Sequence, residues 1–334
     1  MPEIRLVVES AGSRLDRFLT DSHPEVPRSR WDAWIREGRV ILNGQPVSKS
    51  GTKLRVGDVL ETGLPDVAPP AADLSPEAMD LPTLFEDDRL WIINKPAGLV
   101  VHPGPGHPSG TVVNALLARI RDGWSLSSDA SAEGDEPTED DVPPTPWPGL
   151  VHRLDRYTTG CLALAKDEAA MAHLQAQFKA RSVEKRYLAL ARNSRRLPEL
   201  GSLLVDEPIA RHRVDRMKMT ISAAGRPSQT RFRVLARARG LALVECELLT
   251  GRTHQIRVHL SHIGAPILGD TLYGGAPQWQ EEGGQIFPCP HPALHAWKLA
   301  LDHPGDGRRL DVQAPLPEAF CECLARIGLA DVLA

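Results

Sequence analysis

The most constraining feature of the sequence is the run GLVHRLDRYTTG at residues 149–160. Its apolar start and its terminal glycine predict a short buried strand that leads into a turn. At the end of this strand Asp155 lies between Arg153 and Arg156. Cations this close lower a carboxylate pKa by roughly 1–3 pH units, so Asp155 is predicted to be an anion at neutral pH. Such a group suits a nucleophile or a base, and a purely structural arginine–aspartate pair is the alternative interpretation.

Composition limits the class of protein. With 334 residues, 42% hydrophobic and 25% charged, the chain is long enough for one large domain and a small one. No apolar run approaches the roughly 18 residues of a membrane span, and the N-terminus lacks the pattern of a secretory signal, so we expect a cytoplasmic protein with no membrane partner. The five cysteines are scattered; Cys321 and Cys323 have no second Cys/His pair at zinc spacing and are predicted to be structural and free.

Charge is distributed unevenly along the chain. The overall net charge is −4, but residues 148–262 contain twenty-one basic and ten acidic side chains, a net charge of +11. Residues 63–147 carry a net charge of −11. A local positive field of this size suits a phosphate backbone, and a solvated basic face without function is the alternative.

Residues 1–62 are predicted to form a separate module. Helical spacing near residues 15–19 and 29–37 is followed by a hairpin at 40–47 with an Asn-Gly turn and by a second strand pair around Gly57. Two helices that lead into small hairpins, with exposed basic residues, resemble the S4 RNA-binding domain; a dimerisation or folding appendage is the alternative. The candidate RNA-binding residues of this module are Arg28, Arg30, Arg36 and Lys49.

Two segments have the composition of linkers. Residues 63–80 are rich in Pro, Ala and Asp without periodicity, and we interpret them as a partly stiff linker. Residues 122–147 hold eight acidic and no basic side chains, and we expect a disordered insertion. The second domain is therefore expected to occupy residues 81–334.

Several motifs of this second domain belong together. The run at 149–160, IINKPAGLVVHP at 92–103, TVVNALL at 111–117 and TGRTHQIRVHL at 250–260 resemble the RluA-type pseudouridine synthases, with Thr159 replacing the serine usual in that family. The strand predicted at 183–190 places Lys185 and Tyr187 on one face. Because His254 and His259 are five residues apart with no carboxylate near, we expect no metal site.

The resemblance has specific implications. It implies an α+β fold in which a central mixed, mainly antiparallel sheet carries flanking helices. It implies isomerisation of uridine to pseudouridine in RNA, most readily ribosomal RNA, by a cofactor-free monomer. Asp155 would be the catalyst, Arg257 would hold its carboxylate and Tyr187 would pack on the base. Further RNA contacts are expected from the residues Arg153, Arg156, Lys185, Arg252 and His254. A non-catalytic RNA-binding protein of ribosome assembly and a synthase acting on transfer RNA are the alternatives.

Overall fold

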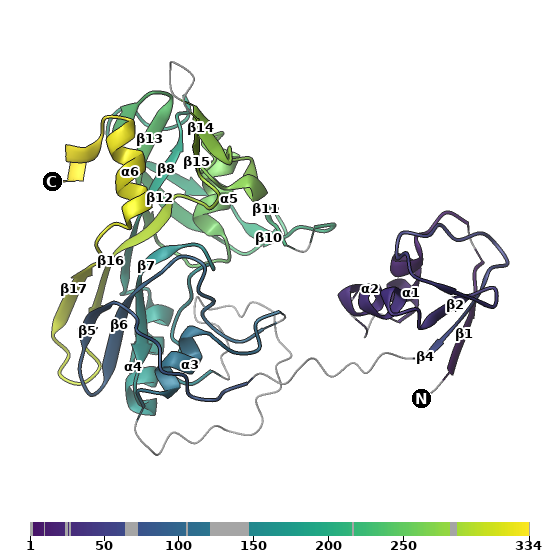
Figure 1. Cartoon of the computed structure of the whole chain (residues 1–334). Helices are drawn as coiled ribbons and strands as arrows, with labels where there is room; N and C mark the ends of the chain where they lie inside the picture. Colours follow the sequence, from purple (N-terminus) through teal and green to yellow (C-terminus); the bar gives the residue numbers. More distant parts are fainter. Residues whose placement is uncertain are drawn as a thin grey trace. The chain divides into compact units, whose positions relative to one another are not determined.

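The computed structural model describes residues 3–9, 11–23, 26, 28–63, 73–104, 106–120, 147–215, 217–280 and 286–333. The chain divides into two compact units, residues 1–71 and 72–334 (Figure 1). Each unit has a hydrophobic core of its own. Most of the predicted acidic insertion, residues 122–146, lies outside the described residues.

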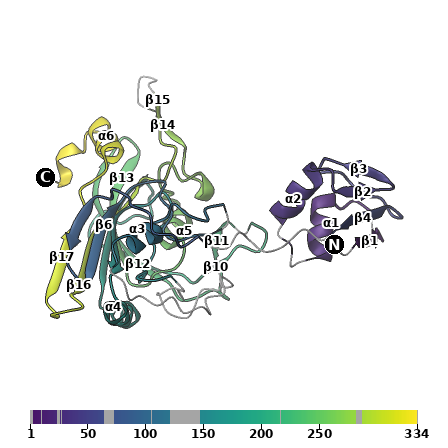
Figure 2. The ribbon, with the colours of Figure 1, turned by 60° about the horizontal axis from the view of Figure 1, so that its bottom comes forward.

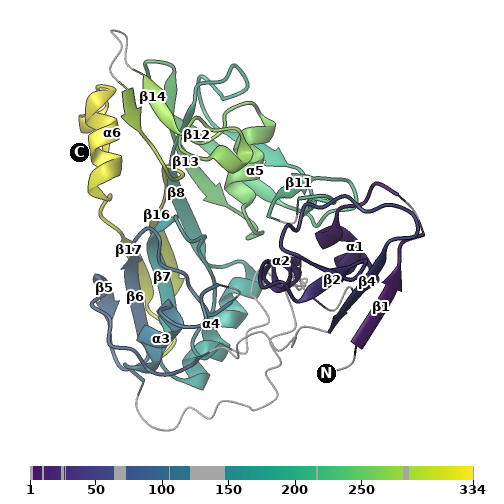
Figure 3. The ribbon, with the colours of Figure 1, turned by 45° about the vertical axis from the view of Figure 1, so that its right-hand side comes forward.

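The first unit is a four-stranded antiparallel sheet with two helices (Figure 3). Its elements are β1 (Glu3–Val7), α1 (Leu15–Ser22), α2 (Arg28–Arg36), β2 (Val40–Leu42), β3 (Gln45–Val47) and β4 (Val59–Gly63). The apolar faces of the helices, with Leu19, Trp31 and Ile35 fully buried, pack against Val40 and Leu60 of the sheet. This burial supplies most of the driving force for folding so small a module.

One predicted strand pair of this unit is wrong. The hairpin at 40–47 is confirmed, and Asn43 and Gly44 both have positive φ as its tight turn requires. Gly57 does not lie between two paired strands, because β4 pairs with β1 and with β2 instead. The N-terminal strand completes the sheet, and such a distant partner leaves no local signal in the sequence.

The second unit is built on a nine-stranded sheet. Its strands are β5 (Thr83–Glu86), β6 (Leu90–Lys95), β7 (Thr159–Ala165), β8 (Glu184–Arg192), β9 (Leu203–Asp206), β12 (Gln229–Ala238), β13 (Leu241–Leu248), β16 (Leu294–Asp302) and β17 (Arg309–Gln313). The order is β5-β6-β7-β16-β8-β13-β12-β9, with β17 paired to β16. Only the β16–β7 pair is parallel among the pairings of this sheet, so the predicted mixed, mainly antiparallel sheet is confirmed.

Helices cover both faces of this sheet (Figure 2). Alternate residues of β8 separate the faces: Ala189 and Ala191 join the core beneath α3 (Val112–Leu117) and α5 (Gln255–His262), whereas Leu188 and Leu190 pack beneath α6 (Glu318–Arg326). The same alternation in β7 directs Ala163 toward α4 (Glu168–Ala180). The remaining elements are β10 (Ile209–Arg211), β11 (Met219–Ile221), η1 (Thr271–Tyr273), β14 (Gln278–Gln280), β15 (Ile286–Pro288) and η2 (Ala330–Leu333).

The predicted linker is too long at its C-terminal end. Asn114 of α3 donates hydrogen bonds to the carbonyl oxygens of Asp73 (2.7 Å) and Ser75 (3.0 Å). The backbone amide of Glu77 in turn donates to the Asn114 carbonyl (3.0 Å). Residues 73–80 are therefore part of the second unit, because the buried amide of Asn114 needs these partners.

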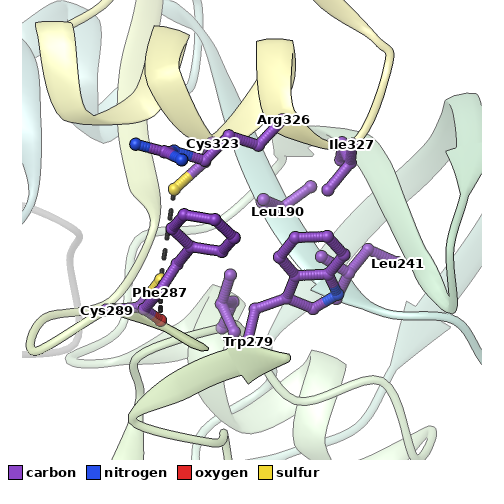
Figure 4. A pocket seen from close by; sticks show the side chains of 9 residues that line it. Leu190, Leu241, Trp279, Phe287, Cys289, Cys323, Arg326 and Ile327 are labelled. Atoms are coloured by element: carbon purple, nitrogen blue, oxygen red, sulfur yellow. Dashed lines mark hydrogen bonds between the residues drawn. The ribbon is translucent and has the colours of Figure 1, made fainter. Parts of the chain in front are cut away.

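A small apolar pocket lies beneath the C-terminal helix α6 (Figure 4). Leu190 and Leu241 of the sheet, Trp279 and Phe287 of the β14–β15 hairpin and Ile327 line it. The sulfur atoms of Cys289 and Cys323 lie 4.0 Å apart at its side. All five cysteines are free, including Cys321 and Cys323, for which this was predicted.

Candidate active site

Asp155 lies in a loop at the middle of the large sheet. The predicted strand at its N-terminal side is wrong: Leu150 forms only an isolated bridge with Leu164, and β7 begins after the acid, at Thr159. A hydrogen bond from the Thr158 amide to the Asp155 carbonyl (3.1 Å) closes a turn. The carboxylate is 24% exposed, so it is accessible from solvent within an otherwise buried surrounding.

The register of three strands brings Asp155 to Tyr187. Gly160 at the start of β7 pairs with Ala296 of β16, which pairs with Tyr187 of β8. Gly160 has φ +108°, and a Cβ atom there would lie 2.2 Å from the Ala296 carbonyl oxygen. The glycine that ends the motif therefore permits this close approach. Tyr187 is 7% exposed on the face beneath α5.

Arg257 of α5 connects two carboxylates. Its Nη1 atom donates to Asp155 Oδ2 (3.0 Å), while Nε and Nη2 donate to Asp270 Oδ2 (2.7 Å) and Oδ1 (2.9 Å). The side chain of Asp270 is 1% exposed, so the bidentate pair is buried. Asp270 thus fixes the guanidinium, and one further N–H of the same group points at Asp155. The Oδ1 atom of Asp155 accepts no hydrogen bond from the residues that the structure describes.

The electrostatics favour an ionised Asp155. Burial alone would raise the pKa of Asp155, but neighbouring positive charges and the hydrogen bond from Arg257 lower it below its ordinary value. His254 adds to this only when protonated, and burial lowers the pKa of His254. At neutral pH the main cation that stabilises the carboxylate is therefore Arg257, with a smaller contribution from Arg153. The pKa of Arg257 is itself raised, against its burial, by Asp270 and Asp155.

His254 and Tyr273 complete the surroundings of the carboxylate. His254 has the left-handed backbone conformation (φ 57°) at the start of α5, which places Nε2 3.7 Å from Asp155 Oδ2. Its Nδ1 atom lies 2.7 Å from the hydroxyl of Tyr273, whose ring lies against the Arg257 guanidinium.

Sequence reasoning missed Asp270 and Tyr273. Both belong to the stretch GAPILGDTLYGG at 264–275, in which nothing local indicates a role in the site. Only the fold shows that this stretch passes beneath α5.

Lys95 is a third residue whose place the sequence did not reveal. It is fully buried, and its Nζ atom donates to the carbonyl oxygens of Pro96, Leu99 and Arg156 at 2.9–3.0 Å. Burial lowers the pKa of Lys95 to about 8. With no N–H left over, Lys95 holds the loop after β6 against the Asp155 loop and does not contact phosphate.

The predicted RNA-binding residues of this unit separate into two groups. Arg153 and Arg156 are exposed beside Asp155, and Arg156 also donates to the Gly98 carbonyl (3.1 Å). Arg252 is half-buried and precedes α5. Lys185 is only 7% exposed and lies against the ring of Phe178, 5.7 Å from its centroid. Because so little of Lys185 is exposed, it offers a polyanion much less surface than Arg153 and Arg156 do, and its contact with RNA stays a prediction.

The corresponding residues of the first unit all lie on its surface. Arg28 bonds Asp16 (2.6 Å), Arg36 pairs with Asp32 (2.8 Å), and both retain exposed guanidinium surface. Arg30 and Lys49 are exposed.

No group of three metal-ligating side chains is arranged to hold an ion in the described part of the chain. His259, half of the histidine pair considered above, is fully buried and bonds Thr230 Oγ1 (2.9 Å) and the Glu207 carbonyl oxygen (3.0 Å). Within the same residues, no helix is both long and apolar enough to cross a bilayer.

Comparison with known proteins identifies the family. The family model described as RNA pseudouridylate synthase matches residues 89–262, which include both the Asp155 loop and α5, and an S4 domain model matches residues 13–60. The chain belongs to the RNA pseudouridine synthases. It is therefore an isomerase that acts on RNA, and its N-terminal unit is an S4 domain.

The similarity to relatives extends over nearly the whole of this chain. It is 36% identical over 319 residues to the uncharacterized RNA pseudouridine synthase YlyB of Bacillus subtilis, covering 96% of this chain and 95% of that one. It is 38% identical over 325 residues to the ribosomal large subunit pseudouridine synthase D of Pseudomonas aeruginosa, covering 93% and 91%. Among solved structures, human RNA pseudouridylate synthase domain containing 4 matches 74% of this chain and 93% of its own, with a TM-score of 0.52 and 30% identity.

Proposed function

We propose that this synthase converts specific uridines of large-subunit ribosomal RNA to pseudouridine, with Asp155 as the catalyst and without a cofactor. The observation that carries the proposal is the carboxylate of Asp155, held through one oxygen by Arg257 and accessible to solvent. Asp155 Oδ1 accepts no hydrogen bond from the described residues, which leaves one oxygen available for chemistry.

The reaction conserves every atom of the nucleotide. The bond between N1 of uracil and C1′ of ribose breaks, the base turns, and a new bond forms between C5 and C1′. The proton on C5 is lost and N1 gains one, so no electron acceptor or group donor is needed. An anionic carboxylate can begin this sequence by attacking the ribose or base, or by removing a proton from the sugar.

Arg257 and Tyr187 act around this carboxylate. Arg257 keeps Asp155 ionised and fixes its direction, since three of its N–H groups are held by two acids. Burial and the nearby charge of Asp155 raise the pKa of Tyr187, so its hydroxyl remains protonated at neutral pH. Tyr187 therefore offers the base an aromatic surface and a hydroxyl that can donate.

The target uridine must leave its stack before it reaches Asp155. Extrusion of a base costs a few kcal/mol and least in a loop or a damaged helix. Arg153 and Arg156 are exposed on either side of the acid and can bind the flanking phosphates or occupy the vacated space. The strongly basic region 148–262 and the S4 domain add contacts that do not depend on the base sequence.

Three observations support ribosomal RNA as the substrate. Several relatives of 36–38% identity carry the name ribosomal large subunit pseudouridine synthase D, and they match more than nine-tenths of this chain. An S4 domain at the N-terminus and the basic block around Asp155 both suit a large, folded polyanion.

Release of tritium from RNA labelled at C5 of uridine tests the proposal. Wild-type protein should release tritium from large-subunit ribosomal RNA, whereas Asp155→Asn should lose nearly all turnover and retain RNA binding. Asp302→Asn, which changes an exposed carboxylate on β16, is the matched control. A wild-type protein that releases no tritium would favour a non-catalytic RNA-binding function. Faster tritium release from transfer RNA would make transfer RNA the substrate, and full activity of Asp155→Asn would refute Asp155 as the catalyst.

A further inference from the structure

The hydroxyl of Tyr273 joins three segments beside the catalytic loop. It accepts a hydrogen bond from the backbone amide of Met219 in β11 (2.8 Å) and lies 2.7 Å from Nδ1 of His254. The other ring nitrogen of His254, Nε2, lies 3.7 Å from Asp155 Oδ2. The groups therefore form a chain in the order Met219, Tyr273, His254 and Asp155.

The donors and acceptors of this chain determine where each of its protons lies. The amide of Met219 is a donor only, so its proton points at the Tyr273 oxygen. Burial raises the pKa of Tyr273 to about 12, so the hydroxyl keeps its single proton at neutral pH. His254 Nδ1 is the acceptor within reach of that proton among the described residues. A proton on Nδ1 would leave the hydroxyl proton without this acceptor.

We propose that Tyr273 is a positioning residue for the isomerisation, because its hydroxyl holds His254 as the neutral tautomer that carries its proton on Nε2. An N–H group of His254, and not a lone pair, then faces the carboxylate of Asp155. This inference rests on the proposed role of Asp155 as the catalyst.

The arrangement benefits the carboxylate in two ways. In the opposite tautomer the Nε2 lone pair would face an anionic oxygen at 3.7 Å, which is repulsive. A doubly protonated ring would instead pair with Asp155 as a second cation beside Arg257 and reduce the reactivity of the carboxylate. The neutral ring with its proton on Nε2 avoids both the repulsion and the second cation, and its N–H group can also donate to an oxygen of the bound nucleotide.

The groups around His254 act on the protonation of its ring in opposite directions, so the hydroxyl of Tyr273 can shift the pKa of His254. Asp155 and Asp270 favour protonation of the ring, whereas burial and the guanidinium groups of Arg257 and Arg153 oppose it. The bond from Tyr273 is made to the neutral ring, so it opposes protonation too. Removal of the hydroxyl should let His254 gain a proton at higher pH.

Nitrogen-15 NMR of the full chain, labelled at histidine, tests the tautomer directly. Subtracting the spectrum of His254→Gln identifies the signals of His254 among those of the twelve histidines. At pH 7.5 we expect a protonated, pyrrole-type Nε2 and a pyridine-type Nδ1 in the wild type, and a higher midpoint of titration in Tyr273→Phe. A proton on Nδ1, or on both nitrogens, in the wild type overturns the inference.

Kinetics test the consequence for turnover. Tyr273→Phe keeps the ring on Arg257 and should lower kcat about threefold to tenfold at the pH optimum, the range for one neutral hydrogen bond. Its acid limb should move to higher pH with KM little changed. Asp302→Asn, which changes an exposed carboxylate on β16, should keep the wild-type limb. In a His254→Gln background Tyr273→Phe should add no shift, and an equal shift there refutes the inference.

The two proposals fail separately. An active Asp155→Asn variant would refute the catalyst and leave the NMR result on the tautomer unchanged. A wrong tautomer with an inactive Asp155→Asn would refute only the role of Tyr273.

Discussion

Replacement of Asp270 by asparagine removes the group that fixes Arg257. The change is nearly isosteric, but the new side chain would present one oxygen and one NH₂ to a guanidinium that now donates at 2.7 and 2.9 Å. One N–H of Arg257 would face another donor, and its buried charge would lose half of its compensation. Breaking a buried ion pair by removing one partner costs about 3–5 kcal/mol, which we expect as the loss in free energy of unfolding.

The same change should also alter turnover. Without Asp270, the guanidinium can turn and bind both oxygens of Asp155, which covers the oxygen that is otherwise available. Asp270→Asn should therefore lose most activity at temperatures where it remains folded. Urea unfolding followed by tryptophan fluorescence measures the stability, and tritium release measures the turnover.

A matched exposed pair provides the control. Asp302 pairs with Arg309 at 3.3 Å, with side chains 44% and 39% exposed, and exposed pairs contribute only about 0–1 kcal/mol. Asp302→Asn should therefore have little effect on either measurement. Equal stability losses in Asp270→Asn and Asp302→Asn would refute the role assigned to the buried pair.

Three further predictions concern the scaffold around the site. Gly160→Ala should destabilise the protein by more than about 3 kcal/mol in urea unfolding, because its new methyl would lie 2.2 Å from a backbone oxygen. Gly98→Ala, also at positive φ but in open space, should cost only about 1–2 kcal/mol, and equal costs for the two variants would contradict this reasoning. Lys95→Met removes a buried donor from three carbonyl oxygens and should lower stability by about 3 kcal/mol or more, and an unchanged urea midpoint would count against it. Burial and the charge of Lys185 lower the pKa of His152 from 6.5 to about 3, so the folded state resists a proton that the unfolded chain accepts. Stability should be complete above pH 6.5 and fall by about 1.4 kcal/mol per pH unit below it, and His152→Gln should reduce that slope; identical slopes would show that His152 is not responsible.

The family and the mixed, mainly antiparallel sheet could be predicted from the sequence, and the sequence also points to Asp155 as the candidate acid. The motif around Asp155 and the run that contains Arg257 are continuous in the chain, so their residue types and spacing could be read directly. The exposure of Arg153 and Arg156 and the helix carrying Arg257 agree with that reading.

Tertiary structure alone decided which side chains share the carboxylate. Asp270 and Tyr273 are more than one hundred residues from Asp155, and they contact it through Arg257 and His254 because α5 packs over the point where β7, β16 and β8 meet. Lys185 and Tyr187 share a strand face by periodicity, yet one lies under α4 and the other near the acid. Sequence alternation gives only the face of a strand, whereas burial and hydrogen-bond partners depend on what packs there.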